Sequence, residues 1–455
     1  MTIPSRSFEL PRREDLAAML RLAGPVVVVQ LGMMLMGVVD TVIVGHRSSE
    51  DLAAVALGHL FVMAASGFGL GTLLALDPLV AQAVGAGDEE GMRRAFQRGL
   101  LLAAVFAVPS SLVLLPGEPV LALLGQPPEV IPIAAGYARR IIPAMFPFFA
   151  FVVLRQTLQA MERVRPIVHV IVLANLVNVL LDLLLVYGLW GFPELGALGS
   201  AWATSACRWL MALSLLILGR RELAPLLAGL DRAVLRAAPL WRTVRLGLPI
   251  GVQLQLEFAA FGVIALLMGT LGTVPVAAHQ VALNLAALTY MVPLGVSAAS
   301  AVRVGQAVGR ADPDGARRSA GAGLLCGAGF MAVCGVVFLS IPSALASVYT
   351  SVPEVLALTA ALIPIAGFFQ VFDGLQAVSA GVLRGLGDTR APMIVNLLGF
   401  WLVGMPVSIA LCFPLGLGPV GLWWGLVAGL GIVAVVLVWR VAVKLRGAVA
   451  RIAVE

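Results

Sequence analysis

Long apolar runs limit the folds that this sequence can adopt. Twelve stretches are long and apolar enough to cross a bilayer, for which a helix needs about 20 residues. Short turn signals such as Gly85-Ala-Gly-Asp separate them. Because 60% of the 455 residues are hydrophobic and only 12% are charged, a soluble protein is excluded. We expect an all-α membrane protein whose twelve transmembrane helices cover approximately 16–46, 52–85, 93–115, 135–160, 165–190, 196–219, 243–270, 276–308, 316–342, 355–383, 391–413 and 418–443.

The arginines predict how these helices are oriented. With the N-terminus in the cytoplasm, most arginines fall in segments on the cytoplasmic side, six of them between 220 and 245. Arg47, Arg139 and Arg140 fall on the outer side. Cytoplasmic loops carry such an excess of basic residues, so we predict that both termini are cytoplasmic. Membrane topology explains the basic residues, and the net charge of +6 therefore does not indicate nucleic-acid binding.

The chain repeats itself at a spacing of 224 residues. Pro25 and Pro249 correspond, each inside the first helix of its half. A polar motif recurs as well, and shared apolar composition does not produce it: Gln82, Gly85, Asp88, Gly91, Arg93 and Arg94 return as Gln306, Gly309, Asp312, Gly315, Arg317 and Arg318. We predict two six-helix lobes, 1–230 and 231–455. Six is even, so both lobes share one orientation, as in secondary transporters built from parallel repeats.

Acidic residues within the predicted spans indicate polar sites, because an acid at membrane depth is costly and usually faces a cavity or a partner. In the first lobe, Asn175, Asn178 and Asp182 share one helix face. Asp40 and Asp182 both fall in the outer halves of their helices, so we expect one polar cluster to contain them. Asp77 precedes Pro78 at the inner part of its helix, where a structural role is expected.

The second lobe carries different acids. Asp40 aligns with Ile264 at the repeat spacing, whereas Glu257 and Asp373 lie on helices of the second lobe. Gln280 and Asn284 lie one turn apart on the span that follows the one with Glu257, and both can face the same space. We therefore expect a second, unlike site formed by Glu257, Asp373 and Gln280, which binds a cation or a substrate.

Each of these residues also has a structural interpretation. Asp40 can simply accept hydrogen bonds from nearby backbone or hydroxyl groups, and Asn175 and Asn284 can bridge helices. Arg208, within a span, can pair with an acid or reach the inner interface. The sequence leaves these alternatives open.

Flexible apolar side chains are candidates for the lining of a substrate cavity. Met33, Met36 and Met63 have the adaptability that varied ligands require, although core packing explains each of them equally simply. Phe369, beside Asp373, can offer an aromatic face to a cation. The histidines show no ligand spacing, so no metal site beyond a coupling Na⁺ is expected.

The sequence resembles the multidrug and toxic compound extrusion (MATE) family over nearly its whole length, with a match to the NorM-type branch. Five motif pieces in this order carry the resemblance: Val39–Gly45, Val80–Gly85, Ala277–Ala282, Arg303–Gly309 and Leu383–Arg390. The resemblance implies two six-helix lobes around a V-shaped cavity and export of organic, often cationic, compounds in exchange for entering sodium or protons. It further implies a prokaryotic cytoplasmic (inner) membrane, no cofactor, and a monomer that works in the bilayer.

The family's site residues transfer onto this chain position by position. Asp40 matches the acid of helix 1, Asn178 and Asp182 match the polar pair of helix 5, and Thr204 matches a threonine of helix 6. Glu257 and Asp373 resemble the acids of helices 7 and 10 in the NorM-type branch. Some sodium-coupled members carry a tyrosine where this chain has Phe369, so one possible oxygen ligand for sodium is absent here.

Two other classes of function are alternatives to this one. A flippase or exporter of a lipid-linked or endogenous metabolite shares the broad superfamily pattern, but twelve spans and several buried acids disfavour it. A membrane enzyme or receptor is disfavoured because no Ser–His or metal constellation lies within the spans and no predicted segment outside them is large enough for separate chemistry. The first-lobe residues Asp40, Asn178, Asp182 and Thr204 are therefore predicted to couple ion entry to export.

Overall fold

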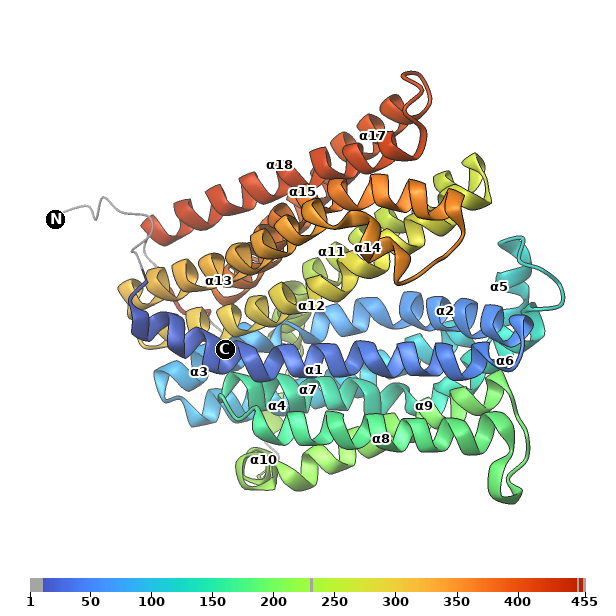
Figure 1. Cartoon of the computed structure of the whole chain (residues 1–455). Helices are drawn as coiled ribbons and strands as arrows, with labels where there is room; N and C mark the ends of the chain where they lie inside the picture. The colour runs from blue at the N-terminus through green and yellow to red at the C-terminus, as the bar shows by residue number, and fades with distance from the viewer. Residues whose placement is uncertain (1–10, 230–231, 448–449, 453–455) are drawn as a thin grey trace. The chain divides into compact units, whose positions relative to one another are not determined.

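The computed structural model describes residues 11–229, 232–447 and 450–452, and all regular structure within them is helical (Figure 1). The elements are α1 (Arg13–Gly45), α2 (Ser49–Leu73), α3 (Leu76–Ala86), α4 (Glu89–Leu114), α5 (Gly117–Leu123), α6 (Ile131–Ile141), η1 (Ile142–Ala144), α7 (Met145–Ala160), α8 (Arg165–Tyr187), η2 (Leu189–Gly191), α9 (Ala197–Leu218), α10 (Arg220–Leu227), η3 (Arg232–Leu235), α11 (Ala237–Leu271), α12 (Thr273–Gly309), α13 (Pro313–Ser340), α14 (Pro342–Ser347), α15 (Pro353–Gly385), α16 (Arg390–Asn396), the π-helix η4 (Leu397–Gly404), α17 (Met405–Cys412) and α18 (Gly418–Arg446).

The predicted set of twelve spans is confirmed. Within the described residues, twelve continuous or broken helices are long and apolar enough to cross a membrane. Three of them contain a break: Ser49–Ala86 divides into α2 and α3, Ile131–Ala160 contains η1, and Arg390–Cys412 contains the π-helix. Pro143 lies in η1, where its ring and missing N–H favour such a break. The hydropathy of a run does not reveal these interruptions.

The polar part of the repeat builds helix starts. Asp88 Oδ1 accepts a hydrogen bond from the Gly91 N–H at 2.8 Å, and Asp312 Oδ1 accepts one from the Gly315 N–H at the same distance. These aspartates cap α4 and α13, which satisfies a backbone N–H that the helix itself leaves free. A Cβ on either glycine would lie within 2.4 Å of the capping carboxylate, so a larger residue there would require the carboxylate to shift.

The chain forms two compact units. We call the first the C-terminal unit; it comprises Val252–Ala453 with Ala81–Gly87 and the segment Met1–Val27, as far as these are described. The N-terminal unit comprises Val28–Val80 and Asp88–Gly251. The predicted lobe boundary at residue 230 stays a prediction.

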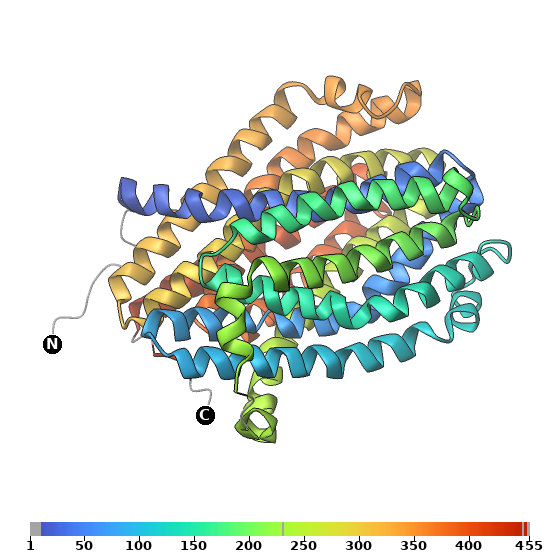
Figure 2. The ribbon, with the colours of Figure 1, turned by 90° about the horizontal axis from the view of Figure 1, so that it is seen from below.

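Each unit is a helical bundle. In the N-terminal unit, α2 packs on α6, α4 on α7, and α8 on α9. In the C-terminal unit, α15 packs against α12, α13 and α18, and α12 also packs against α13 (Figures 1 and 2). The acids singled out in the sequence lie inside these bundles, on helices that side-chain packing holds in place.

Glycines of the repeated motif allow two backbones of the C-terminal unit to touch. A Cβ on Gly309 would lie 2.1 Å from the Gln82 carbonyl oxygen, and a Cβ on Gly85 would lie 2.1 Å from that of Gln306. The Gln82 side chain donates to the Gly385 carbonyl at 2.9 Å and accepts from the Ile452 N–H at 2.8 Å. The repeated motif therefore closes a crossing of α3 and α12.

Candidate ion and substrate sites

A buried polar cluster lies in the N-terminal unit, where α1, α8 and α9 each contribute side chains. Asp40 of α1 is 6% exposed, and the Thr204 hydroxyl of α9 donates to its Oδ2 at 3.0 Å. Asn178 and Asp182 of α8 are fully buried. Asp182 interacts with the Asp40 side chain. The structure thus brings together Asp40, Asp182 and Thr204, and it places Asn178 one turn from Asp182 on α8.

Most polar atoms of this cluster have no hydrogen-bond partner among the described residues. They are Asp40 Oδ1, both carboxylate oxygens of Asp182, both amide atoms of Asn178 and the hydroxyl of Ser200. Ser200 of α9 lies beside Asp182, in a geometry that is not a regular hydrogen bond. Each buried polar group left unsatisfied costs about 1–3 kcal/mol. Several of them in one place indicate a site built for an occupant.

Two ionised carboxylates cannot satisfy one another. Asp40 and Asp182 would both be acceptors only, and like charges at close range repel. A proton shared between them, or a small cation coordinated by both, removes that conflict. The cluster is therefore chemically suited to binding a proton or a monovalent cation.

Asn175, on the same face of α8, has a different role. Its Nδ2 donates to the Gly32 carbonyl at 3.0 Å and to the Ile171 carbonyl at 2.9 Å. The first bond ties α8 to α1, because Gly32 belongs to α1. Asn175 therefore bridges helices, the structural interpretation left open by the sequence.

A second polar network lies in the C-terminal unit. The Gln376 Nε2 of α15 donates to Glu257 Oε2 of α11 at 3.3 Å and to Asn396 Oδ1 of α16 at 3.4 Å. Asp373 is 6% exposed and interacts electrostatically with Glu257. The predicted acid pair is thus brought together, and Gln376 and Asn396 complete its surroundings.

The break in the eleventh span adjoins this network. The π-helix η4 begins directly after Asn396, and π-helical turns occur frequently at functional sites. Within it, the Trp401 Nε1 donates to the Leu256 carbonyl at 3.2 Å, next to Glu257. The widened turn therefore places a tryptophan donor against the backbone that carries this acid.

The remaining predicted residues make contacts of their own. Gln280 is exposed and donates to Asn284 Oδ1 at 3.3 Å, so the structure pairs it along its own helix. Phe369 is 3% exposed and packs against Phe261 and Trp423, with ring centroids 6.2 and 6.3 Å apart.

The three methionines proposed as cavity lining are half-buried. Met33 receives a contact from Arg155 Nη1 to its sulfur at 3.2 Å. Met36 and Met63 lie on α1 and α2. Their part in a substrate cavity stays a prediction.

Comparison with known proteins places this arrangement in a family. A model described as MatE matches residues 25–184 and 249–410, two stretches that begin at the corresponding prolines of the repeat. The chain belongs to the MatE family. The resemblance inferred from the motif pieces is thereby confirmed.

Individual relatives agree with this membership. The "Probable multidrug resistance protein NorM" of Rhizobium meliloti (strain 1021) is 39% identical over 432 residues, which cover 93% of this chain and 92% of that protein. The "Multidrug resistance protein PmpM" of Pseudomonas aeruginosa is 37% identical over 442 residues, covering 94% and 92%. The solved structure of the eukaryotic MATE transporter AtDTX14 superposes with a TM-score of 0.86 at 25% identity, covering 95% of this chain and 98% of that one.

Two residues of this MatE-family chain that sequence reasoning missed complete the first cluster. Tyr137 of α6 is 2% exposed and lies against Thr204; Gly58 of α2 makes room for it, since a Cβ there would lie 2.6 Å from the ring. Ser200 lies four residues before Thr204, on the same face of α9, a spacing that the sequence does show. Tyr137 carries no such local signal, because only the packing of α2, α6 and α9 brings it to the site.

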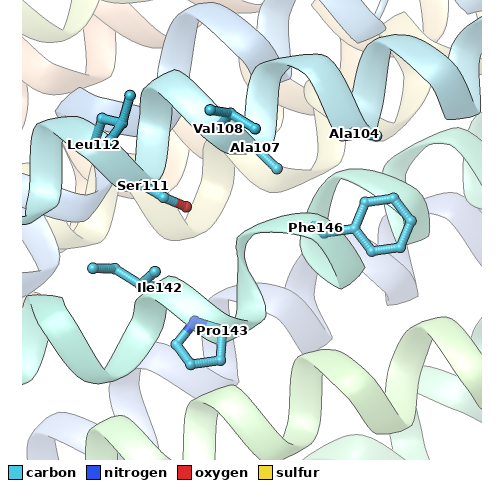
Figure 3. Close-up of a pocket in the computed structure, with 8 residues that line it drawn as sticks. All are labelled: Ala104, Ala107, Val108, Ser111, Leu112, Ile142, Pro143 and Phe146. Carbon is cyan, nitrogen blue, oxygen red and sulfur yellow. The ribbon is translucent and has the colours of Figure 1, made fainter.

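A separate groove of about 410 Å³ opens beside the break at η1 (Figure 3). Apart from Ser111, its lining is apolar: Ala104, Ala107, Val108 and Leu112 of α4 face Ile142, Pro143 and Phe146. The groove contains none of the acids. Its surface suits hydrocarbon.

Proposed function

We propose that this chain is a multidrug efflux antiporter that exports varied, often cationic, organic compounds in exchange for entering Na⁺ or H⁺. It would work as a multi-pass protein of a prokaryotic cytoplasmic membrane, with both termini in the cytoplasm. Family membership and the names of the relatives support export of drugs. The buried acids support coupling to a cation.

One observation carries the coupling proposal. Asp40 and Asp182 interact in a buried site where several polar atoms have no partner. A protein that served only to hold this helix packing would satisfy these groups from within. An entering proton or sodium ion satisfies them, and its departure leaves them charged and exposed to mutual repulsion.

Coupling follows from that difference between the two states. With a cation bound, the cluster is compensated and the packing of α1, α8 and α9 around it is favoured. Once the cation leaves, the carboxylates favour hydration or a new partner, and the two lobes (1–230 and 231–455) change which side is open. Glu257 and Asp373 provide the second site, where a cationic compound finds negative charge and the aromatic side chains near Phe369.

The available driving force is sufficient. One cation entering down 100 mV releases about 2.3 kcal/mol, and each pH unit adds about 1.4 kcal/mol per proton. Hundredfold export of a neutral compound costs about 2.8 kcal/mol. One or two cations per cycle therefore suffice for a neutral compound. Export of a monovalent cation costs about 2.3 kcal/mol more per 100 mV, so one-for-one exchange relies on the chemical gradient of the entering ion.

Asp40→Asn tests the proposal, because the amide retains the shape of the side chain and removes its charge. We expect ion-driven drug efflux in proteoliposomes to fall to the level of empty liposomes, measured separately with an imposed sodium gradient and an imposed pH gradient. Asp88→Asn is the matched control, since asparagine still caps a helix, and efflux should equal that of the wild type. Unchanged ion-driven efflux by Asp40→Asn would refute the coupling role of this cluster.

A further inference from the structure

Arg208 is a buried cation next to the first acid cluster. Ser200, Thr204 and Arg208 follow one another at intervals of four residues and so form one stripe along α9. Arg208 lies one turn, about 6 Å, beyond the threonine that donates to Asp40. Its electrostatic partners include Asp40 itself.

The surroundings of Arg208 hold its charge without pairing it. The side chain is 9% exposed, and its Nη1 is buried without a hydrogen-bond partner. The guanidinium carbon lies 4.5 Å from the ring centroid of Phe148 on α7, a cation–π contact that stabilises the charge without neutralising it. Since arginine stays protonated throughout the physiological pH range, the site contains a permanent positive charge.

The other titratable side chains near the acids add little to the net charge of the cluster. Tyr137 of α6 and Cys207 of α9 interact electrostatically with the acids; near pH 8 an ordinary phenol is neutral and an ordinary thiol is mostly neutral. His59 of α2 interacts electrostatically with Arg208 and Asp40, and an ordinary imidazole is neutral at pH 8. In its cation-free form, with both Asp40 and Asp182 ionised, the cluster holds two carboxylates and one guanidinium, a net charge of one negative, and a proton or a sodium ion bound to the pair counts as its cation.

We propose that Arg208 is a built-in counter-cation that leaves the acid pair Asp40 and Asp182 with one net negative charge, so that this site takes up one monovalent cation and not two. The proposal rests on the coupling function proposed above and sets its stoichiometry in the N-terminal unit. A site that needs one cation exchanges one charge per cycle against the exported compound. Without Arg208 the same pair of carboxylates would require two.

The experiment counts cations bound by the purified full-length protein at pH 8. Glu257→Gln and Asp373→Asn are present throughout, so that the second site does not contribute. Bound ²²Na⁺ is measured by equilibrium dialysis, and the protons held by the site are counted by titration with a pH-indicator dye from about pH 10.5 downwards, as the difference from the reference, because a buried acid pair retains a proton above the ordinary range of a carboxyl. A reference lacking both first-site carboxyls, Asp40→Asn with Asp182→Asn, sets the zero. We expect one cation above the reference with Arg208 present, and one with Arg208→Lys.

Arg208→Gln should raise the count to two, and adding Asp182→Asn to Arg208→Gln should restore it to one. A residue needed only for packing on Phe148 would not be rescued by loss of a carboxyl. A count of one for Arg208→Gln, or of two for the unmodified site, would overturn the proposal. Arg98→Gln controls for loss of a buried arginine elsewhere in the same unit, and its count should stay at one.

A folding defect of Arg208→Gln would also test the proposal. If Arg208→Gln does not purify as a monodisperse protein, recovery of folding by Asp182→Asn supports charge balance, whereas failure of that double variant as well overturns it. Asp40→Asn tests the coupling function independently. Should Asp40→Asn remove no cation, the proposed function fails whatever the count found for Arg208→Gln.

Discussion

Thr204→Val removes the hydroxyl that donates to Asp40 Oδ2 at 3.0 Å. Valine has nearly the same shape, so the packing of α9 against α1 is largely retained. The other oxygen of Asp40 already has no partner. The variant therefore destabilises the ionised, cation-free Asp40. The protonated carboxyl is affected less, because it needs no donor to stabilise a negative charge.

The size of the effect follows from the bond that is lost. A hydrogen bond to a charged group contributes about 1.5–3 kcal/mol. Because each 1.36 kcal/mol corresponds to a factor of ten, the cation-free state is destabilised by about 10- to 150-fold relative to the proton-bound state. Proton-driven efflux should then respond to protons at 10- to 150-fold lower concentration, about one to two units higher in pH.

If sodium is the coupling ion, Thr204→Val should shift the half-maximal ion concentration in the opposite direction. A sodium ion at this site would use the threonine oxygen as a ligand, and valine has none to offer, so the half-maximal sodium concentration should rise. Efflux of a cationic dye from proteoliposomes, measured across pH and sodium concentration, distinguishes the two ions by the sign of the shift. Thr204→Ser should behave like the wild type. Ser205→Ala, which removes a neighbouring hydroxyl bonded to the Arg140 carbonyl at 2.7 Å, is the control. A Thr204→Val response identical to the wild type for both ions would refute this reasoning.

Two further predictions concern the C-terminal unit. Gly309→Ala should lower the midpoint of thermal unfolding by several degrees in detergent, because the new Cβ would lie 2.1 Å from the Gln82 carbonyl oxygen. The control Gly24→Ala has open space around the new Cβ and should leave the midpoint unchanged or raise it slightly. Equal midpoints for the two variants would contradict the contact. Gln376→Leu removes the donor to Glu257 and should tighten binding of a fluorescent organic cation by roughly 5- to 150-fold, because the 1–3 kcal/mol that an unsatisfied buried partner costs applies to the empty site. Unaltered or weaker binding would show that the glutamine does not stabilise the cation-free carboxylate.

Hydropathy and helix periodicity predicted the parts of this protein that depend on local sequence. The twelve spans follow from apolar length alone, and the shared face of Asn178 and Asp182 follows from their spacing on α8. The placing of Asp40 near Asp182 required only a rough depth in the membrane. Such inferences succeed because each rests on one helix or on the bilayer that all helices share.

Contacts that depend on packing between helices were beyond this reasoning. Tyr137 joins the first cluster only because Gly58 lets α2 and α6 approach. Gln376 and Asn396 meet across α15 and α16, and neither carries a local signal. Gln280 and Asn284 share one face of α12, as their spacing predicted; the place of Gln280 beside the acids stays a prediction.

The reciprocal crossing of α3 and α12 has a consequence for how the two repeats relate. Gln82 meets Gly309 and Gln306 meets Gly85, so one patch of the repeat contacts its own equivalent, which is the isologous contact of a two-fold homodimer. Both partners lie within the C-terminal unit, so this is a pairing of two copies of one motif inside one bundle. Because each glycine lies against the glutamine backbone of the other copy, a larger residue in one copy cannot be accommodated by altering that copy alone. Asp40, Asp182, Glu257 and Asp373 lie outside the motif, where no such matching applies and the two copies of the repeat are free to differ.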